Sequence, residues 1–311
     1  MQIVIIGAGM AGLAAGTRLK RAGHNVRLFD KGRGASGRMA SRRIDTTLGE
    51  AVFDHGAQYF KAREEAFTEC VSGWQRDGLV APWAAAGPAA FVGTPSMNAP
   101  LRAMAASLDV TWSARVDAIS RDERGWRVTG EGVDADACDA VIVALPAEQA
   151  VALLSPVDQH FSGLAAAGIS APCWTVMLAF DAPVAYAADI LADLVEPIGW
   201  AARNSAKPGR TGPEAWVVHA SPAWSKQHLE DSPAAVVTAL QLALAHAVGG
   251  ALPGVISSTA HRWRYALPAA ASREFLWNGS RQIGICGDWL AGPRVDAAWL
   301  SGHRLAGAII G

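Results

Sequence analysis

The sequence has few cysteines, and they form no cluster. Cys70, Cys138, Cys173 and Cys286 lie far apart and make no CxxC pair. This spacing excludes a cysteine-rich zinc site and a disulfide framework, and it fits the reducing cytosol. The sequence also has no HExxH, GxSxG or GxxxxGK[ST] motif. We therefore expect no metal, and neither a serine hydrolase nor a P-loop enzyme.

An excess of charge of one sign and a long hydrophobic run are also missing. The 27 basic and 28 acidic residues give a net charge of -1, which offers no electrostatic attraction to nucleic acid or anionic lipid. The apolar runs at 140–145 and 234–248 are interrupted or too short to span a bilayer, and no cationic leader precedes Ile3. With 51% hydrophobic residues, the 311 residues predict a cytoplasmic globular protein that binds a small molecule and no membrane.

A strand–turn–helix–strand pattern opens the chain. An apolar run over 3–6 leads into the sequence Gly-Ala-Gly-Met-Ala-Gly at 7–12, and a helix over 13–22 and a strand over 26–29 follow. In a βαβ unit, three such glycines permit a tight turn, a close approach of pyrophosphate and close helix packing, and an acid after the second strand binds ribose. The pattern predicts a dinucleotide site that includes Gly7, Gly9, Ala11, Gly12 and Asp30.

The segment after Asp30 bears on which dinucleotide is bound, because FAD and NAD both use this unit. Residues 31–38 form a glycine-rich loop that contains Lys31, Arg33 and Arg38. Such a loop can fold back over the dinucleotide and add cationic contacts to its phosphates. The alternative is a solvated surface loop.

Several further motifs carry a family resemblance. They are Asp30-Lys31 with Ser36-Gly37-Arg38-Met39, and the segments at 54–59, 261–266, 287–289 and 294–302. Together they resemble the renalase family of flavoproteins, within the flavin amine oxidase group, although Ser36 stands where that family usually has glycine. The resemblance implies an α/β fold: a Rossmann-like FAD-binding domain of the glutathione-reductase and amine-oxidase type, and a second, sheet-containing substrate domain. It also implies that FAD is bound non-covalently.

The resemblance and the helix pattern extend the expected cofactor site to the C-terminal motifs. The family position that matches Asp288 implies a hydrogen bond to the pyrophosphate or ribityl region of FAD. A last helix is expected over 297–310, and the backbone at its start can stabilise a reduced, anionic flavin. The expected cofactor-binding residues are Gly7, Gly9, Ala11, Gly12, Asp30, Lys31, Gly37, Arg38, Gln58, Tyr59, Val116, Asp288, Asp296 and Ala297.

Two discontinuous domains are expected. Helical periodicity marks 62–77, 96–108 and 234–248, and strand-like runs lie at 110–112, 116–120, 126–128 and 141–145. The stretch 156–282 holds six of the twelve tryptophans. We expect a FAD-binding domain from 1–60, 96–155 and 283–311, and a substrate domain from 61–95 and 156–282.

The candidate catalytic residues are aromatic. Tyr59, His261, Trp263 and Trp289 either pack in the core or form a wall that stacks on a flat substrate. Flavin accepts hydride itself, so an enzyme of this kind needs no acid–base dyad. The resemblance implies oxidation of the 2- and 6-dihydro isomers of NAD(P) to NAD(P)⁺, with dioxygen reduced to hydrogen peroxide. A soluble flavin amine oxidase and a non-catalytic flavin-binding protein are the alternatives, and the oligomeric state stays open.

Overall fold

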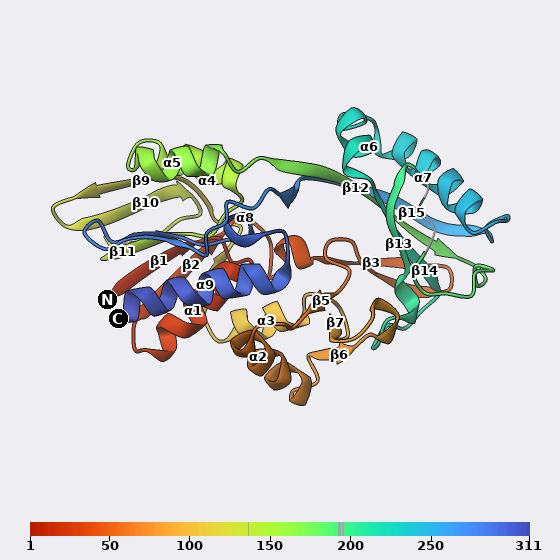
Figure 1. Cartoon of the computed structure of the whole chain (residues 1–311), viewed down its shortest axis with the longest axis horizontal. Helices are drawn as coiled ribbons and strands as arrows, with labels where there is room; N and C mark the ends of the chain where they lie inside the picture. Colours follow the sequence, from red (N-terminus) through yellow and green to blue (C-terminus); the bar gives the residue numbers. More distant parts are fainter. Residues whose placement is uncertain (136, 192–193, 195) are drawn as a thin grey trace.

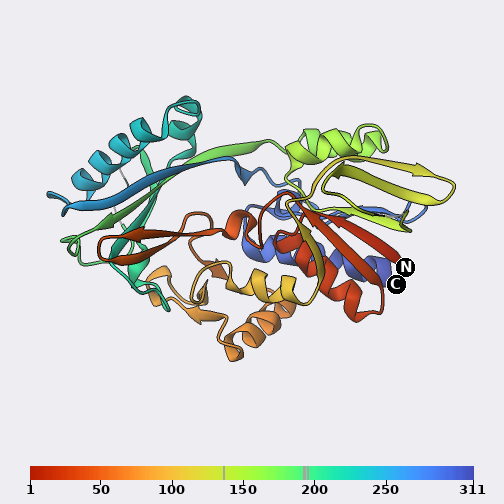
Figure 2. The same ribbon diagram turned by 180° about the vertical axis from the view of Figure 1, so that it is seen from behind.

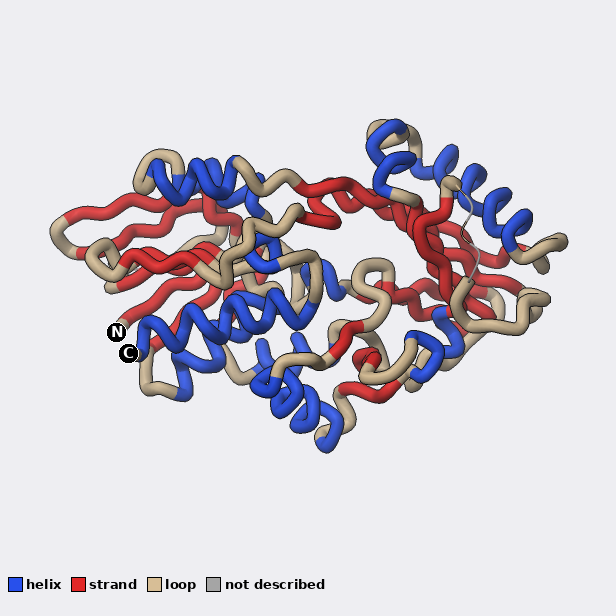
Figure 3. The backbone as a smooth tube through the Cα atoms, viewed as in Figure 1, coloured by secondary structure: helices blue, strands red, loops and turns tan. Residues whose placement is uncertain are grey.

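The chain forms an elongated molecule with two parts. The computed structural model describes residues 1–135, 137–191, 194 and 196–311. One part is a layered α/β structure that carries both termini, and the other is built on an antiparallel sheet (Figure 1). Two long strands, β12 (Ser170–Phe180) and β15 (Val255–Pro268), run from the first part into the second. Figure 3 shows these strands as a bridge between the parts.

A six-stranded sheet forms the centre of the α/β part. Its strand order is β16-β17-β11-β1-β2-β8, and every neighbouring pair except β16–β17 is parallel. The apolar strands β1 and β11 are buried almost throughout, as expected for strands covered on both faces. The strand bounds are β1 Gln2–Ile6, β2 Asn25–Asp30, β8 Asp109–Trp112, β11 Ala140–Val143, β16 Leu276–Asn278 and β17 Ile283–Ile285.

Alternate side chains of β1 enter two cores. Ile3 and Ile5 pack with helices α1, α2, α3 and α9 on one face. Val4 and Ile6 pack with α4, α5 and the β9–β10 hairpin on the other, and Figures 1 and 2 show this layering from both sides. The bounds are α1 Met10–Arg21, α2 Glu65–Arg76, α3 Ala99–Ala106, α4 Ala147–Leu154, α5 Gln159–Ala166, α8 Asp288–Ala291, α9 Val295–Ile310, β9 Arg115–Asp122 and β10 Gly125–Glu131.

The second part is a four-stranded antiparallel sheet in the order β13-β14-β12-β15. One face packs against helix α7, and the other packs against Ala51 and Phe53 of the β3–β4 hairpin. The bounds are β3 Ser41–Thr46, β4 Gly49–Asp54, β13 Ile198–Arg203, β14 Glu214–Ala220, α6 Pro222–Gln227 and α7 Pro233–Ala247, with the short helix η3 at Asn204–Ala206. A small sheet of β5 Phe60–Lys61, β6 Val80–Pro82 and β7 Ala90–Gly93, and the short helices η1 Gly37–Met39 and η2 Ala84–Ala86, complete the description.

The packing of two segments does not coincide with the expected domain ranges. The β3–β4 hairpin lies within the range 1–60 expected for the FAD-binding domain, but its apolar side chains pack on the second part. Helix α2 lies within the range 61–95 expected for the substrate domain, but Phe67, Val71 and Trp74 pack in the core of the α/β part. The position of each segment in the sequence therefore falls in one expected domain, whereas its apolar side chains pack in the other part.

The main helices and strands lie where the sequence predicted them. Helices α2, α3, α7 and α9 overlap the ranges 62–77, 96–108, 234–248 and 297–310. Helix α1 begins three residues earlier than expected, at Met10, because Gly9 already serves as its N-cap. The β3–β4 hairpin was not expected, and its β3 strand is only partly buried. In the described residues, no helix is both long enough and apolar enough to cross a membrane.

Candidate cofactor and substrate site

A cavity of about 1240 Å³ extends between the two parts. Its wall includes the first glycine turn and the start of α9 from the α/β part, and residues of β13, β14, β12 and β15 from the second part. The volume exceeds the roughly 300–1,000 Å³ of an ordinary small-ligand pocket. The cavity therefore has room for a dinucleotide together with a further ligand.

The glycine turn builds an anion site at the dinucleotide end. Gly7 has a φ of +103°, in the left-handed region that favours glycine. A Cβ on Gly12 would lie 2.0 Å from the carbonyl oxygen of Gly7, whereas one on Gly9 would meet no atom within 4 Å. Gly9 caps α1 without a side-chain bond, and the first residues of the helix, Met10 and Ala11, line the cavity. These features fit a pyrophosphate at the helix N-terminus.

Asp30 holds the same turn in place. Its Oδ2 accepts a hydrogen bond from the N–H of Ala8 at 2.7 Å, and its Oδ1 accepts one from the N–H of Gly32 at 2.7 Å. A carboxylate has about four acceptor positions, so about two stay available, and Asp30 lines the cavity. Asp30 can thus fix the turn and bind a ribose hydroxyl together.

Arg38 and Asp288 form an ion pair on the cavity wall. The distance from Nη2 of Arg38 to Oδ1 of Asp288 is 2.5 Å, and the Asp288 side chain is buried. Burial raises the pKa of Asp288, and the neighbouring guanidinium of Arg38 opposes this rise. The pair joins the loop after β2 to the C-terminal motif.

The start of α9 also reaches the cavity. Val295 and Ala298 line the wall, whereas Asp296 and Ala297 are buried behind it. Asp296 pairs with Arg294, with 3.1 Å between Nε and Oδ1. The N-terminus of this 16-residue helix has no side-chain cap, so its N–H groups can stabilise negative charge in the cavity.

A row of side chains crosses the four-stranded sheet at the other end. Trp200 pairs with His219, His219 with Thr175, and Thr175 with His261 in the strand register. Directly opposite residues in antiparallel strands share a face of the sheet. Trp200, His219 and His261 line the cavity, as does Trp263 further along β15. This face lines the end of the cavity away from the glycine turn, which we refer to as the substrate end.

Trp263 is held by the loop after β4. Its Nε1 donates a hydrogen bond to the carbonyl oxygen of His55 at 2.8 Å. Its ring stacks on the His55 ring at 5.3 Å between centroids and meets the His261 ring edge-on at 4.4 Å. The indole therefore has a fixed orientation in the wall.

The histidines at this end are neutral. Burial, above all, lowers the pKa of His55 to about 3 and that of His219 to about 4, and it also lowers the pKa of His261. The cavity-lining carboxylates among the described residues, Asp30, Asp117 and Asp288, all belong to the α/β part. The second part thus lines the cavity with aromatic rings, with imidazoles of lowered pKa, and with Arg262 and Arg264, which both pair with Glu230.

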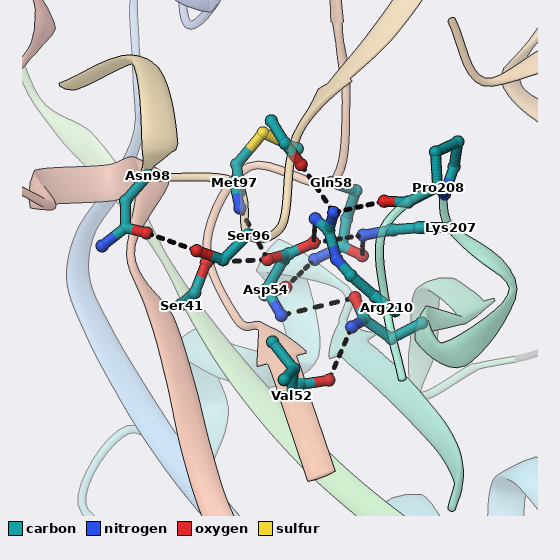
Figure 4. Close-up of polar contacts among 12 residues, drawn as sticks. Ser41, Val52, Asp54, Gln58, Ser96, Met97, Asn98, Lys207, Pro208 and Arg210 are labelled. Atoms are coloured by element: carbon teal, nitrogen blue, oxygen red, sulfur yellow. Dashed lines mark hydrogen bonds and ion pairs between the residues drawn. The ribbon is translucent and has the colours of Figure 1, made fainter. Parts of the chain in front are cut away.

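A buried ionic cluster lies directly behind Gln58 (Figure 4). Asp54 pairs with Arg210 and with Lys207, whose Nζ lies 3.3 Å from Oδ2 of Asp54. Burial alone would raise the pKa of Asp54, but Lys207 and Arg210 outweigh it and hold this pKa at about 2. Burial lowers the pKa of Lys207 to about 8, against the opposing attraction of Asp54.

The structure brings most of the expected site residues to one cavity. Those on its wall are Gly7, Gly9, Ala11, Asp30, Lys31, Gly37, Arg38, Gln58, Val116, Asp288, His261 and Trp263. Those set back from it are Gly12, Tyr59, Trp289, Asp296 and Ala297.

Trp289 and Tyr59 are the expected aromatic residues that do not line the cavity. Trp289 is 1% exposed in a hydrophobic core, where its Nε1 donates to the carbonyl oxygen of Leu145 at 3.2 Å. An aromatic wall at the cavity thus does not include Trp289, because α8 directs its indole into the core. The Tyr59 ring lies 5.7 Å from the Trp200 ring, which itself lines the wall.

Sequence reasoning missed Trp200, Cys173 and Lys207. The first two are ordinary strand residues whose face depends on long-range register. Lys207 precedes Pro208 and Gly209, a pattern typical of an exposed turn. A second cationic residue, Arg210, follows Lys207 three positions later. The sequence alone does not indicate that the side chain of Lys207 or of Arg210 is buried.

Comparison with known proteins agrees with this geometry. Residues 5–72 match the NAD(P)-binding Rossmann-like domain, and residues 76–310 match the flavin containing amine oxidoreductase family. A protein from Exiguobacterium sp. 255-15 described as a protoporphyrinogen oxidase has a similar fold, with a TM-score of 0.79 and 13% identity over 99% of this chain and 98% of that one.

Two amine oxidases also share the fold. Cyclohexylamine oxidase from Brevibacterium oxydans IH-35A has a TM-score of 0.74 and 14% identity over 99% of this chain and 98% of that one. Putrescine oxidase bound to putrescine has a TM-score of 0.68 and 15% identity over 100% of this chain and 99% of that one. At these identities the likeness concerns the fold, while the family match covers most of the sequence. The chain belongs to the flavin containing amine oxidoreductase family.

Proposed function

We propose that this protein is a FAD-dependent oxidase that converts 2- or 6-dihydro isomers of NAD(P) to NAD(P)⁺. Overall, one dihydronicotinamide dinucleotide, one dioxygen and one proton give NAD(P)⁺ and hydrogen peroxide. The supporting observation is the substrate end of the cavity, where Trp200 and Trp263 accompany two neutral histidines. Among the described residues, no carboxylate lies there to bind an ammonium group. Such a wall suits a flat, uncharged dihydropyridine ring.

The cofactor part of the proposal rests on the dinucleotide end. FAD, when bound, supplies the hydride acceptor. Asp30 would bind the adenosine ribose, the N-terminus of α1 and Arg38 the phosphates, and Asp288 the hydroxyls of the ribityl region. No general base is required of the chain, because a dihydropyridine already carries the hydride that it loses.

We propose that FAD is held without a covalent bond. Of the four cysteines, all of which the structure describes, Cys173 lines the cavity. Burial raises the pKa of the Cys173 thiol to about 12, so the reactive thiolate is scarce at neutral pH. The four cysteines are also unpaired, which supports a place of action in the cytosol.

A soluble flavin amine oxidase is the second candidate. The family description and the fold shared with cyclohexylamine and putrescine oxidases favour it. An amine substrate is mainly protonated at neutral pH and must lose that proton before hydride can leave. Its rate of flavin reduction therefore rises with pH, which separates the two candidates.

The test is an anaerobic mixing experiment with the FAD-loaded protein. We expect the 2- or 6-dihydro isomers to bleach the flavin rapidly, at a rate that changes little between pH 6 and pH 7.5. Ordinary NADH and several amines serve as comparisons. Rapid bleaching by amines with a rising pH profile, while both isomers leave the flavin yellow, would replace the proposal by the second candidate. No bleaching by any compound would indicate a flavin-binding protein without catalytic activity.

A further inference from the structure

The buried cluster behind Gln58 holds one more cation than anion. The side chains of Asp54 and Lys207 are 0% exposed and that of Arg210 is 1% exposed. In the part of the chain that the structure describes, neither cation contacts a second carboxylate. With Lys207 protonated, the three side chains carry a net charge of one positive unit away from water.

Asp54 is satisfied without Lys207. Its Oδ1 accepts hydrogen bonds from Oγ of Ser41 at 2.7 Å and from the N–H of Met97 at 3.0 Å. Its Oδ2 accepts a hydrogen bond from Arg210, which also donates to the carbonyl oxygens of Gly93 and Pro208. Burying a second cation beside a carboxylate that is already paired costs free energy. Anchoring of Asp54 therefore does not account for Lys207.

Lys207 instead points through Gln58 toward the cavity. Its Nζ donates to Oε1 of Gln58 at 3.1 Å, and the face of Trp83 lies 5.3 Å away. Nε2 of Gln58 donates to the carbonyl oxygens of Asp54 and Gly56, which fixes the orientation of the amide. Gln58 itself lines the cavity, so one side chain separates the ammonium from the cavity space.

The neighbouring histidine cannot supply this charge. Nε2 of His219 lies 3.3 Å from Nε2 of Gln58. The two N–H groups of that amide are donated to the carbonyl oxygens of Asp54 and Gly56. Burial lowers the pKa of His219 to about 4, which favours the neutral imidazole at pH 7. Lys207 is therefore the source of positive charge behind this part of the wall.

We propose that Lys207 is a positioning residue which, through Gln58, places a positive charge where it favours the reduced, anionic flavin over the oxidised one. The inference rests on the proposed FAD cofactor, but not on the identity of the substrate. A fixed charge in a buried site acts strongly, because little water screens it. The physical consequence is a higher reduction potential of the bound flavin.

The test is a redox titration of the FAD-loaded full-length protein against a reference dye. In Lys207→Met, we expect the equilibrium constant for two-electron reduction to fall about 10-fold, which corresponds to about 30 mV. Lys207→Arg keeps the charge and should stay within about 3-fold of wild type. Lys207→Met leaves Asp54 and Arg210 as a neutral pair, so the fold should persist, and its thermal unfolding midpoint and FAD content are measured alongside.

Arg210→Met is the matched control. Like Lys207→Met, this substitution removes one positive charge that is paired with Asp54. Unlike Lys207, Arg210 donates to the carbonyl oxygens of Gly93 and Pro208 and not to Gln58. We expect the equilibrium constant for two-electron reduction of the flavin in Arg210→Met to change by less than about 3-fold. An unchanged potential in folded, FAD-loaded Lys207→Met would overturn the inference, and so would an equal loss in Arg210→Met.

The pH dependence of the wild-type potential gives a second readout that needs no Lys207→Met protein. The charged and titratable groups facing Lys207 are Asp54, Arg210 and His219, and Asp54 and His219 titrate well below pH 8. The potential should fall more steeply above about pH 8 in wild type than in Lys207→Arg. Equal slopes would overturn the inference. If the wild-type chain binds no FAD, both this inference and the proposed function are overturned. If it binds FAD but dihydronicotinamides do not bleach the flavin, only the proposed substrate is overturned.

Discussion

Arg38 and Asp288 lie 250 positions apart in the sequence, yet Nη2 of Arg38 is 2.5 Å from Oδ1 of Asp288. Both residues line the cavity, one from the loop after β2 and the other from the start of α8. Burial raises the pKa of Asp288, and the guanidinium of Arg38 opposes this rise by stabilising the charged carboxylate. The pair couples the N-terminal and C-terminal parts of the dinucleotide end.

Arg38→Ala should weaken the binding of FAD. The variant loses a charge-assisted contact worth roughly 1.5–3 kcal/mol, so FAD should dissociate about 10- to 100-fold more readily. Equilibrium dialysis or flavin fluorescence measures this change. Arg115→Ala is the control, because Arg115 also lines the cavity but its ion pair with Asp117 is exposed. Unchanged FAD affinity in Arg38→Ala would show that Arg38 makes no phosphate contact.

Gly302→Ala should destabilise the packing of α1 against α9. A Cβ at Gly302 would lie 1.9 Å from the carbonyl oxygen of Ala11, so the two helices must separate. We expect a loss of about 1–3 kcal/mol in the free energy of unfolding, as is usual for an overpacked core. Gly163→Ala in α5 is the control, because its Cβ meets no atom within 4 Å. Equal urea midpoints for the two variants would contradict the prediction.

Acid should destabilise the protein from about pH 6.5 downward. The pKa of His55 falls from 6.5 in the unfolded chain to about 3 in the folded one, so only the unfolded chain takes up a proton between these values. The free energy of unfolding therefore decreases as pH falls, by up to about 1.4 kcal/mol per pH unit for one such histidine. His55→Gln should flatten the curve of urea midpoint against pH, whereas His246→Gln, at an exposed position of α7, should not. Parallel curves for wild type and His55→Gln would refute this account.

Trp263→Phe and Trp289→Phe should separate activity from stability. Each variant loses an indole N–H bonded to a backbone carbonyl, which costs about 1 kcal/mol of folding free energy. Because Trp263 lines the cavity, its variant should also lose about 10-fold in kcat/KM through misorientation of the substrate. Trp289→Phe should keep kcat/KM within about 2-fold, since its ring lies in the core. Equal kinetic losses in the two variants would place Trp289 nearer the chemistry than the structure does.

The glycine turn and Asp30 could be predicted because these residues of the dinucleotide end are nearly contiguous. The order strand, glycine turn, helix, strand and acid is itself the βαβ unit, and each glycine meets a local requirement. Gly7 adopts a left-handed φ and Gly12 packs on the turn, as the pattern implied. The place of Trp289 could not be predicted in the same way, since a motif gives the identity of a residue but not the direction of its side chain.

The sequence by itself determined the nucleotide-binding turn, the α/β class and the flavin amine oxidase group, because these depend on local backbone geometry and on contiguous motifs. Only the tertiary structure decided the substrate end. A shift of one residue in strand register moves every side chain to the opposite face, so the row of Trp200, His219, Thr175 and His261 depends on pairing across the whole sheet. The burial of Lys207 likewise depends on Asp54, 153 positions away, because a lysine leaves water only where a distant fold supplies its partners.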